Sequence, residues 1–188
     1  MFKKFFQSAA NLLWGPQEKV GAGFKWKQAC FSFAIGMTLY APMFTYYNSM
    51  SYQGEMPPAA PLIREFGVFE YNPGTQALKK RPFVRLNLIN GNSYMVEDGP
   101  NLLGEIFHGT EATSLLYIEG FLLKNGKGNF WPNVVKDLNG NNVVDEGLMR
   151  RDLLGNRNAF GPLLLYMYLF LLPFWVISIC NIFVLTGK

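Results

Sequence analysis

Oxygen-bearing side chains recur at every second position in the segment KDLNGNNVVDEG, residues 136–147. Asp137, Asn139 and Asn141 carry the first three, and Asp145 follows four residues later. Alternate positions of a tightly curved loop can point their oxygens at one hard cation, and carboxylate, amide and backbone oxygens are the ligands that Ca²⁺ prefers. This spacing therefore predicts a calcium ion held by these four side chains.

The twelve residues DLNGNNVVDEGL, 137–148, resemble the calcium loops of EF-hand and dockerin proteins. The resemblance implies that Val143 supplies a carbonyl at the seventh position and Asp145 an oxygen at the ninth. Two positions depart from the pattern: Asn142 replaces the usual sixth-position glycine, and Leu148 replaces the twelfth-position carboxylate. A loop without that last carboxylate should bind calcium weakly, which suits a compartment where calcium is millimolar.

The same segment also fits a β-hairpin that needs no metal. The β-prone stretches NVVKDL and NVVDE, residues 133–138 and 142–146, flank the Asn-Gly pair 139–140. Asn and Gly tolerate the positive φ angles of a tight hairpin turn. The sequence favours this hairpin, and the calcium loop stays the alternative.

Residues suited to catalysis are sparse in this chain. His108 is the single histidine, and one histidine cannot build the usual catalytic zinc site. Glu97 and Asp98 are adjacent carboxylates, but neighbours on a strand point to opposite faces of a sheet. No GxSxG elbow, phosphate-binding loop or dinucleotide fingerprint is present in the sequence. We therefore predict a protein that is not an enzyme and that has no cofactor other than calcium.

Two long apolar segments dominate the composition of the chain. Residues 28–54 and 158–187 contain no charged side chain, and each run exceeds the roughly 20 residues that a helix needs to cross a bilayer. Within them, residues 28–48 and 162–185 are the predicted transmembrane helices. The first contains several small or helix-perturbing residues, which favours packing against another helix. The sequence therefore predicts a membrane protein with two spans.

Lysines are concentrated before the first span. Residues 1–27 carry five lysines and one glutamate, and Lys188 ends the short tail 186–188 after the second span. Positive charge stays cytoplasmic in short flanking segments, so both termini are predicted to be cytoplasmic and residues 49–161 extracytoplasmic. The net charge of +4 is then an orientation signal and gives no reason to expect nucleic-acid binding. We predict a multi-pass protein of the inner membrane of a bacterium.

The start of the chain, MFKKFFQSAANLLW, has the pattern of an amphipathic helix. Its apolar residues recur at helical spacing, and its lysines fall mainly on the other side. A helix of this kind lies in the headgroup region of a membrane, here in the inner leaflet. Gly15 and Pro16 are predicted to end it.

The extracytoplasmic segment alternates apolar and polar residues over short stretches. After a Pro-rich arm at 51–62, strands are predicted at 65–71, in a hairpin over 81–98, within 114–131 and in the hairpin 133–146. Five or so strands of this length indicate a small antiparallel barrel or sandwich, so the fold class is α+β with two transmembrane helices flanking a β-rich domain. The arrangement resembles oligonucleotide/oligosaccharide-binding-like or SH3-like barrels in strand number and length.

An anchored domain of this kind is expected to be a non-catalytic accessory or assembly subunit of the inner membrane. Its partners would be the lipid bilayer and another membrane protein or a second copy of the chain. Two alternatives belong to other classes. One is an immunity or exclusion protein that captures a toxin or phage component, and the other is a sensor modulated by weak calcium binding.

Overall fold

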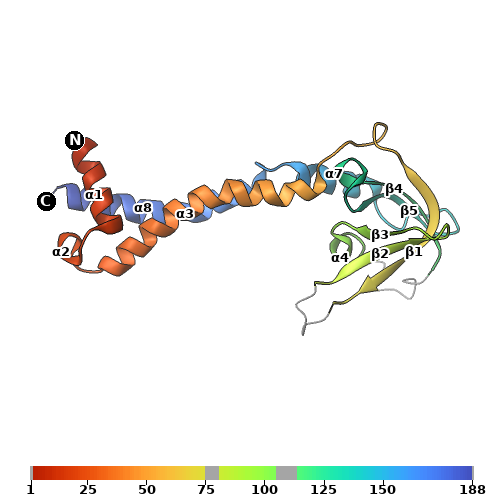
Figure 1. The fold of residues 1–188 in the computed structure, drawn as a ribbon, viewed down its shortest axis with the longest axis horizontal. Helices are drawn as coiled ribbons and strands as arrows, with labels where there is room; N and C mark the ends of the chain where they lie inside the picture. Colours follow the sequence, from red (N-terminus) through yellow and green to blue (C-terminus); the bar gives the residue numbers. More distant parts are fainter. Residues whose placement is uncertain (1, 75–80, 105–113, 188) are drawn as a thin grey trace. The chain divides into compact units, whose positions relative to one another are not determined.

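A computed structural model describes residues 2–74, 81–104 and 114–187, which divide into two units (Figure 1). Residues 1–47 and 159–188 form the helical unit, and residues 48–158 form the barrel domain. The helices are α1 (Phe2–Trp14), α2 (Gln17–Val20), α3 (Phe24–Ser49), the 3₁₀ turn η1 (Met50–Tyr52), α4 (Gly99–Leu102), α6 (Leu123–Gly126), α7 (Glu146–Arg157) and α8 (Pro162–Thr186). The strands are β1 (Ile63–Asn72), β2 (Phe83–Leu88), β3 (Ser93–Val96), β4 (Leu116–Leu122) and β5 (Phe130–Lys136).

Two helices are long and apolar enough to cross a membrane. They are Phe24–Tyr52, which joins α3 and η1, and Pro162–Thr186, which is α8. The predicted spans 28–48 and 162–185 lie inside them, so α3 begins four residues earlier than expected and α8 ends one residue later. The existence of both helices is confirmed, while their place in a membrane stays a prediction that length and composition support.

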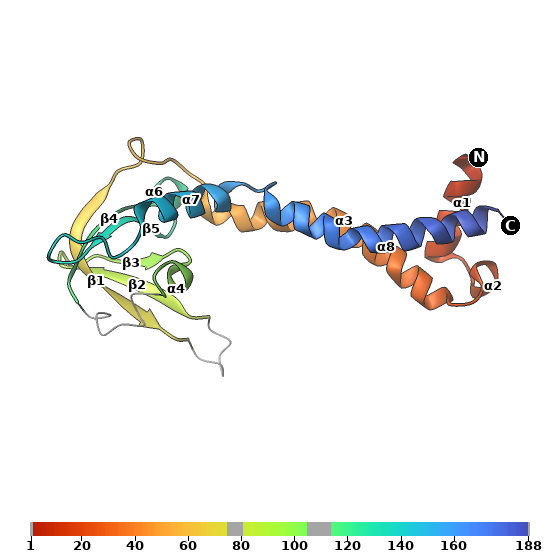
Figure 2. The ribbon, with the colours of Figure 1, turned by 180° about the vertical axis from the view of Figure 1, so that it is seen from behind.

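Helices α3 and α8 lie side by side within the helical unit (Figures 1 and 2). On α3, Ala34 and Ala41 are fully buried, and Thr38 between them accepts a hydrogen bond of 2.9 Å from Nε1 of Trp175. On α8, Ser178 is fully buried. The two helices also meet through large side chains, because the hydroxyl of Tyr168 donates to the carbonyl of Thr38 at 3.4 Å and the rings of Phe31 and Trp175 are 6.0 Å apart.

Helix α1 begins and ends as the sequence predicts. The N–H of Gly15 donates to the carbonyl of Asn11 at 2.8 Å and closes the last turn. Its apolar face, however, is not left wholly for a lipid surface, because Leu12 packs in a cluster with Val20, Phe31 and Ile182. Part of the amphipathic face is therefore used for packing within the chain.

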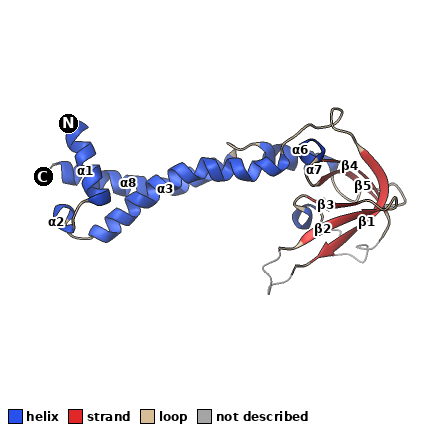
Figure 3. Cartoon of the chain, in the orientation of Figure 1, coloured by secondary structure: helices blue, strands red, loops and turns tan. Residues whose placement is uncertain are grey.

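Residues 48–158 contain a closed β-barrel, which is one of the two architectures, barrel or sandwich, that the sequence predicted (Figure 3). Its strands close in the order β1-β2-β3-β5-β4, with β4 paired to β1. Because β4 returns to lie beside β1 after the meander of the first three strands, the connection is a Greek key. The expectation of a wholly antiparallel sheet was wrong at one seam, where β3 and β5 pair in parallel through Val96 and Phe130.

Alternation along the strands builds the barrel core. Val84, Leu86 and Leu88 of β2 point inward and are buried, as expected, while Arg85 and Asn87 between them are exposed. The same inward set includes large side chains from other strands, such as Phe69, Ile118, Phe130 and Val135. The period of two in the sequence therefore corresponds to the pleat of the sheet.

The chain after the Asn-Gly turn does not form the second strand that the hairpin interpretation predicted at 142–146. It makes one bridge, between Lys136 and Asn142, and then α7 begins. At the start of α7, Oδ1 of Asp145 accepts hydrogen bonds from two backbone N–H groups, that of Gly147 at 2.7 Å and that of Leu148 at 3.2 Å. A carboxylate at this N-cap position satisfies donors that the first turn leaves free, so it favours a helix over a strand here.

Candidate functional site

The chain enters and leaves the barrel domain at one place. Nε2 of Gln53 donates to the carbonyl of Arg157 at 2.9 Å, and Nε of Arg157 donates to the carbonyl of Tyr52 at 2.7 Å. We call these three residues the clasp. The ring of Tyr52 also packs edge-on against the buried Trp131, with ring centroids 5.9 Å apart. The clasp therefore ties the Pro-rich arm to the end of α7 and both of them to the barrel.

One polar atom of the clasp is left unsatisfied. Nη2 of Arg157 is buried and has no hydrogen-bond partner among the described residues. A buried donor without an acceptor costs free energy, which the two hydrogen bonds of the clasp and the packing of Tyr52 offset. Within the Pro-rich arm, the N–H of Ala60 donates to the carbonyl of Met56 at 3.1 Å and closes a turn.

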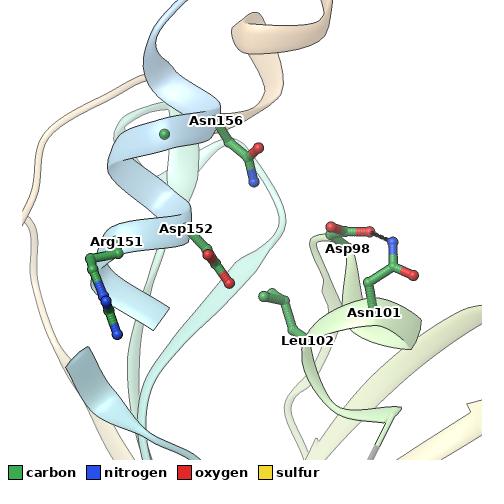
Figure 4. A pocket seen from close by; sticks show the side chains of 7 residues that line it. Asp98, Asn101, Leu102, Arg151, Asp152 and Asn156 are labelled. Atoms are coloured by element: carbon green, nitrogen blue, oxygen red, sulfur yellow. Dashed lines mark hydrogen bonds between the residues drawn. The ribbon is translucent and has the colours of Figure 1, made fainter. Parts of the chain in front are cut away.

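A polar cleft of about 330 Å³ lies between α4 and α7. Figure 4 shows Asp98 at the start of α4 and Asp152 on α7 on opposite sides of the cleft, with Leu102 between them. Arg151 extends from α7 on the side away from Asp98 (Figure 4). The full lining consists of Asp98, Asn101, Leu102, Arg151, Asp152, Gly155 and Asn156.

The backbone at Asp98 has an uncommon conformation. Its φ of 51° and ψ of 27° are left-handed, a region that Asp and Asn tolerate better than other residues with a Cβ atom. Its carbonyl accepts hydrogen bonds from the N–H groups of Asn101 and Leu102, both at 3.0 Å, so Asp98 forms the N-terminal end of α4. Gly99 follows because a Cβ atom there would lie 2.6 Å from Cβ of Val84. The turn thus holds α4 against the barrel and aims Asp98 at the cleft.

The electrostatics of the cleft are dominated by two carboxylates. Burial raises the pKa of Asp98 and the negative charge of Asp152 adds to the rise, while a hydrogen bond of 2.5 Å from Nδ2 of Asn101 works in the opposite direction. Carboxylate oxygens accept hydrogen bonds, and the amides of Asn101 and Asn156 can accept as well. The cleft can therefore receive a group that donates hydrogen bonds or carries positive charge.

We expect the substitution Asp98→Asn to stabilise the domain at neutral pH. The raised pKa means that the charged carboxylate is disfavoured in the folded state, so the contribution of Asp98 to stability is largest below pH about 4 and is lost as pH rises through its folded pKa. Asparagine removes the charge, accepts the same hydrogen bond through Oδ1 and tolerates the left-handed backbone. The melting temperature of the full-length variant in detergent should rise at pH 7 and match the wild type near pH 3; a fall at pH 7 would contradict this.

The residues of the predicted calcium loop form a tight turn. Oδ1 of Asp137 accepts the N–H groups of Asn139 at 2.9 Å and Asn141 at 2.8 Å, and Oδ2 accepts Nδ2 of Asn141 at 2.8 Å. Gly140 takes the positive φ of 85°. Asn141 thus presents its amide nitrogen, a donor, to the carboxylate, and Asp145 is engaged as the cap of α7. This arrangement does not fit a calcium cage, and calcium binding stays a prediction.

We also looked for clusters of His, Cys, Asp and Glu side chains elsewhere in the described part of the chain. Within residues 2–74, 81–104 and 114–187, no group of three or more His, Cys, Asp and Glu side chains is placed to hold a metal ion. His108 lies outside the described residues. Glu97, the other member of the carboxylate pair, follows β3 instead of lying on it and accepts a hydrogen bond of 2.7 Å from Asn129. The pair therefore diverges, with only Asp98 in the cleft.

The turn at Asp137 makes a pH-dependent contribution to stability that distinguishes it from a metal site. Hydrogen bonds from the Asn141 side chain, and then from its backbone N–H, lower the pKa of Asp137. The turn is therefore stabilised above the ordinary aspartate pKa of about 3.9, and this stabilisation is lost as pH falls through the lower folded value. Asp137→Asn should lower the melting temperature at pH 7 and bring it close to that of the wild type at the lowest pH that keeps the protein folded.

The calcium hypothesis is tested in the same experiment. Millimolar calcium at pH 7 should leave the melting temperature of the wild-type protein unchanged, because the carboxylate of Asp137 is occupied by the turn. A rise with calcium that disappears in Asp137→Asn would instead establish a calcium site, since a ligand that binds only the folded state raises the melting temperature.

Comparison with protein-family models, with curated proteins and with solved structures gives no match for this chain. The interpretation of the cleft therefore rests on its geometry. Sequence reasoning singled out Asp98 only as half of a carboxylate pair, and it missed Asp152 and Asn156 because it did not predict α7. The signal for that helix was present: Asp145 as a cap, and Met149 and Leu153 as buried residues four positions apart.

Proposed function

We propose that the protein is a non-catalytic accessory or assembly subunit of a bacterial inner membrane, anchored by α3 and α8 with both termini in the cytoplasm. The barrel domain would then be extracytoplasmic and would bind a partner membrane protein. The observation that carries the proposal is the uncovered apolar surface of the two long helices. In the most apolar 18-residue stretch of each helix, only 28% of the residues are buried in Phe24–Tyr52 and only 17% in α8.

Such low burial requires cover from outside the chain. The core helix of a soluble protein is mostly buried, whereas exposed residues on α8 include Leu165, Leu169, Leu172 and Val176. Exposed apolar surface on this scale is covered either by lipid or by another protein. Aromatic side chains near the helix ends support the bilayer, because Trp and Tyr are enriched where spans meet the membrane surface: Trp14, Trp26, Tyr46, Tyr47 and Tyr166 are exposed.

The surface that we assign to the partner protein is the cleft side of α7. Leu148 lies four residues before Asp152 and therefore on the same side of the helix. It is a large apolar side chain that is 47% exposed, about one helical turn from Asp152 of the cleft. An exposed apolar residue next to polar groups is typical of the anchor of a protein–protein interface.

Co-purification tests this assignment with a matched pair of variants. Leu148→Asp places a charge in the proposed interface, whereas Leu154→Asp places one at a leucine of α7 that is 50% exposed on another side. Tagged wild-type protein and Leu154→Asp should retain the same stoichiometric membrane partner after gentle extraction from the native host. Leu148→Asp should reduce its yield at least tenfold. Equal yields for all three proteins, or no stoichiometric partner for the wild type, would overturn the assignment.

A further inference from the structure

Helix α1 has more apolar surface than its packing in the chain uses. Phe5, Ser8 and Leu12 face the rest of the helical unit, and the Thr186 hydroxyl lies 3.1 Å from that of Ser8. Phe2 and Phe6 are exposed on the adjoining side. The helix is therefore docked against α8 along one side and leaves a second apolar side free.

A hollow of about 260 Å³ lies where these two sides meet α8. Phe2, Phe5, Phe183 and Thr186 line it, and its exposed wall is apolar. The rings of Phe5 and Phe183 are 5.8 Å apart, which holds the wall in place. Ligand pockets usually measure about 300–1,000 Å³, so this hollow suits part of one flexible chain.

The position of the hollow along α8 matches the edge of a bilayer. Twenty-five helical residues extend about 37 Å, more than the roughly 30 Å of the hydrocarbon layer, so the last turn reaches the headgroup region when α8 spans the membrane. Phe183 and Thr186 belong to that last turn. A hydrocarbon chain from the same leaflet can therefore enter the hollow while its headgroup stays at the surface.

The lysines of α1 favour an anionic headgroup at this place. Lys3 and Lys4 of α1 are both exposed and directly follow Phe2. Residues 1–27 as a whole carry five lysines and one glutamate. Each basic residue near an anionic membrane surface contributes about 1 kcal/mol, which corresponds to a factor of about five in binding.

We propose that this hollow binds one anionic phospholipid, with an acyl chain against Phe2, Phe5 and Phe183 and the headgroup phosphate beside Lys3 and Lys4. The inference rests on the membrane location proposed above. The bound lipid would fix α1 against the end of α8 and complete the cover of its free apolar side.

The test is native mass spectrometry of the full-length protein released from nanodiscs that contain equal amounts of phosphatidylcholine and phosphatidylglycerol. Wild-type protein should retain one phosphatidylglycerol in preference to phosphatidylcholine. The exposed pair Lys3→Gln and Lys4→Gln should lower that preference about tenfold or more, and Phe183→Ala should lower the number of retained lipids. Because Lys3 and Lys4 are exposed, their replacement should leave the fold intact.

Two matched controls make the result specific. Lys25→Gln with Lys27→Gln removes the same charge elsewhere in the basic segment, and Phe170→Ala removes a ring of α8 that is 61% exposed, against 54% for Phe183. Both should behave as the wild type. Equal lipid retention in all variants, or an equal loss in the controls, would overturn the proposal. Release of the wild-type protein from native membranes by alkaline carbonate would instead overturn the membrane location itself.

Discussion

Replacing Gly120 with valine is expected to disrupt the barrel. A Cβ atom at this position would lie 2.3 Å from Cζ of Phe130 and 2.4 Å from the carbonyl oxygen of Trp131. The second contact is with backbone of the paired strand β5, so no change of rotamer relieves it. The pairing with β5 is also irregular between Glu119 and Gly120, where the register shifts by a residue as in a β-bulge.

The expected loss is about 3 kcal/mol or more of the free energy of unfolding, at the upper end of what overpacking costs. For a domain that spans residues 48–158, each kcal/mol shifts the melting temperature by about 4 °C. Gly120→Val in the full-length protein should therefore melt at least about 12 °C below the wild type and expose the barrel to proteolysis.

Gly155→Ala provides the control, because no atom lies within 4 Å of the added Cβ and alanine favours a helix interior over glycine by roughly 1 kcal/mol. This variant should be as stable as the wild type or more stable. A Gly120→Val protein with an unchanged melting temperature would show that β4 and β5 do not approach as closely as described.

Replacing Ala34 with leucine is expected to separate the two long helices. Ala34, Thr38 and Ala41 follow one another at spacings of four and three, so they share one side of α3. Thr38 on that side bonds Trp175 of α8, and both alanines are fully buried. Because Ala34 is fully buried on the side of α3 that bonds α8, a leucine there has no free space and should strain this contact at a cost of about 1–3 kcal/mol.

In a bilayer or detergent this cost is not recovered by burying the larger side chain, because lipid is as apolar as leucine. Ala34→Leu should lower the temperature at which the detergent-solubilised protein loses its monodisperse elution in size exclusion. Ser32→Leu adds a comparable side chain at an exposed position of the same helix and should leave that temperature unchanged. The same fall in both variants would mean that added bulk on α3, and not its contact with α8, causes the effect.

Much of the fold follows from local patterns in the sequence. Long uncharged runs predict α3 and α8, since only a helix satisfies every backbone group within an apolar segment. Alternation at β2 and the Asn-Gly-Asn tip, residues 90–92, predict the β2–β3 hairpin, which pairs as expected from Val84–Val96 to Asn87–Ser93. These features are set by residues close together in the sequence, and a local sequence pattern can therefore predict them.

Helix α7 shows where local patterns mislead. Val143 and Val144 have high β-propensity, yet they pack against the barrel core without joining a strand. Gly147 and Gly155 lower the helix propensity of the following residues, but Met149 and Leu153 are buried in the barrel domain. Tertiary burial of one apolar side outweighed the weak intrinsic preference of the segment.

The sequence by itself determined that the chain has two helices able to span a membrane, an amphipathic start and a small β-rich domain between them, because each depends on periodicity over adjacent residues; that this domain closes as a barrel came from the tertiary structure. Tertiary structure alone decided the parallel seam between β3 and β5 and the meeting of Asp98 with Asp152, residues 54 positions apart. It also decided that Phe5 meets Phe183 at the apolar hollow between α1 and α8. Such meetings depend on how the chain closes on itself, since side chains that share no local period come together only when the core that buries them has formed.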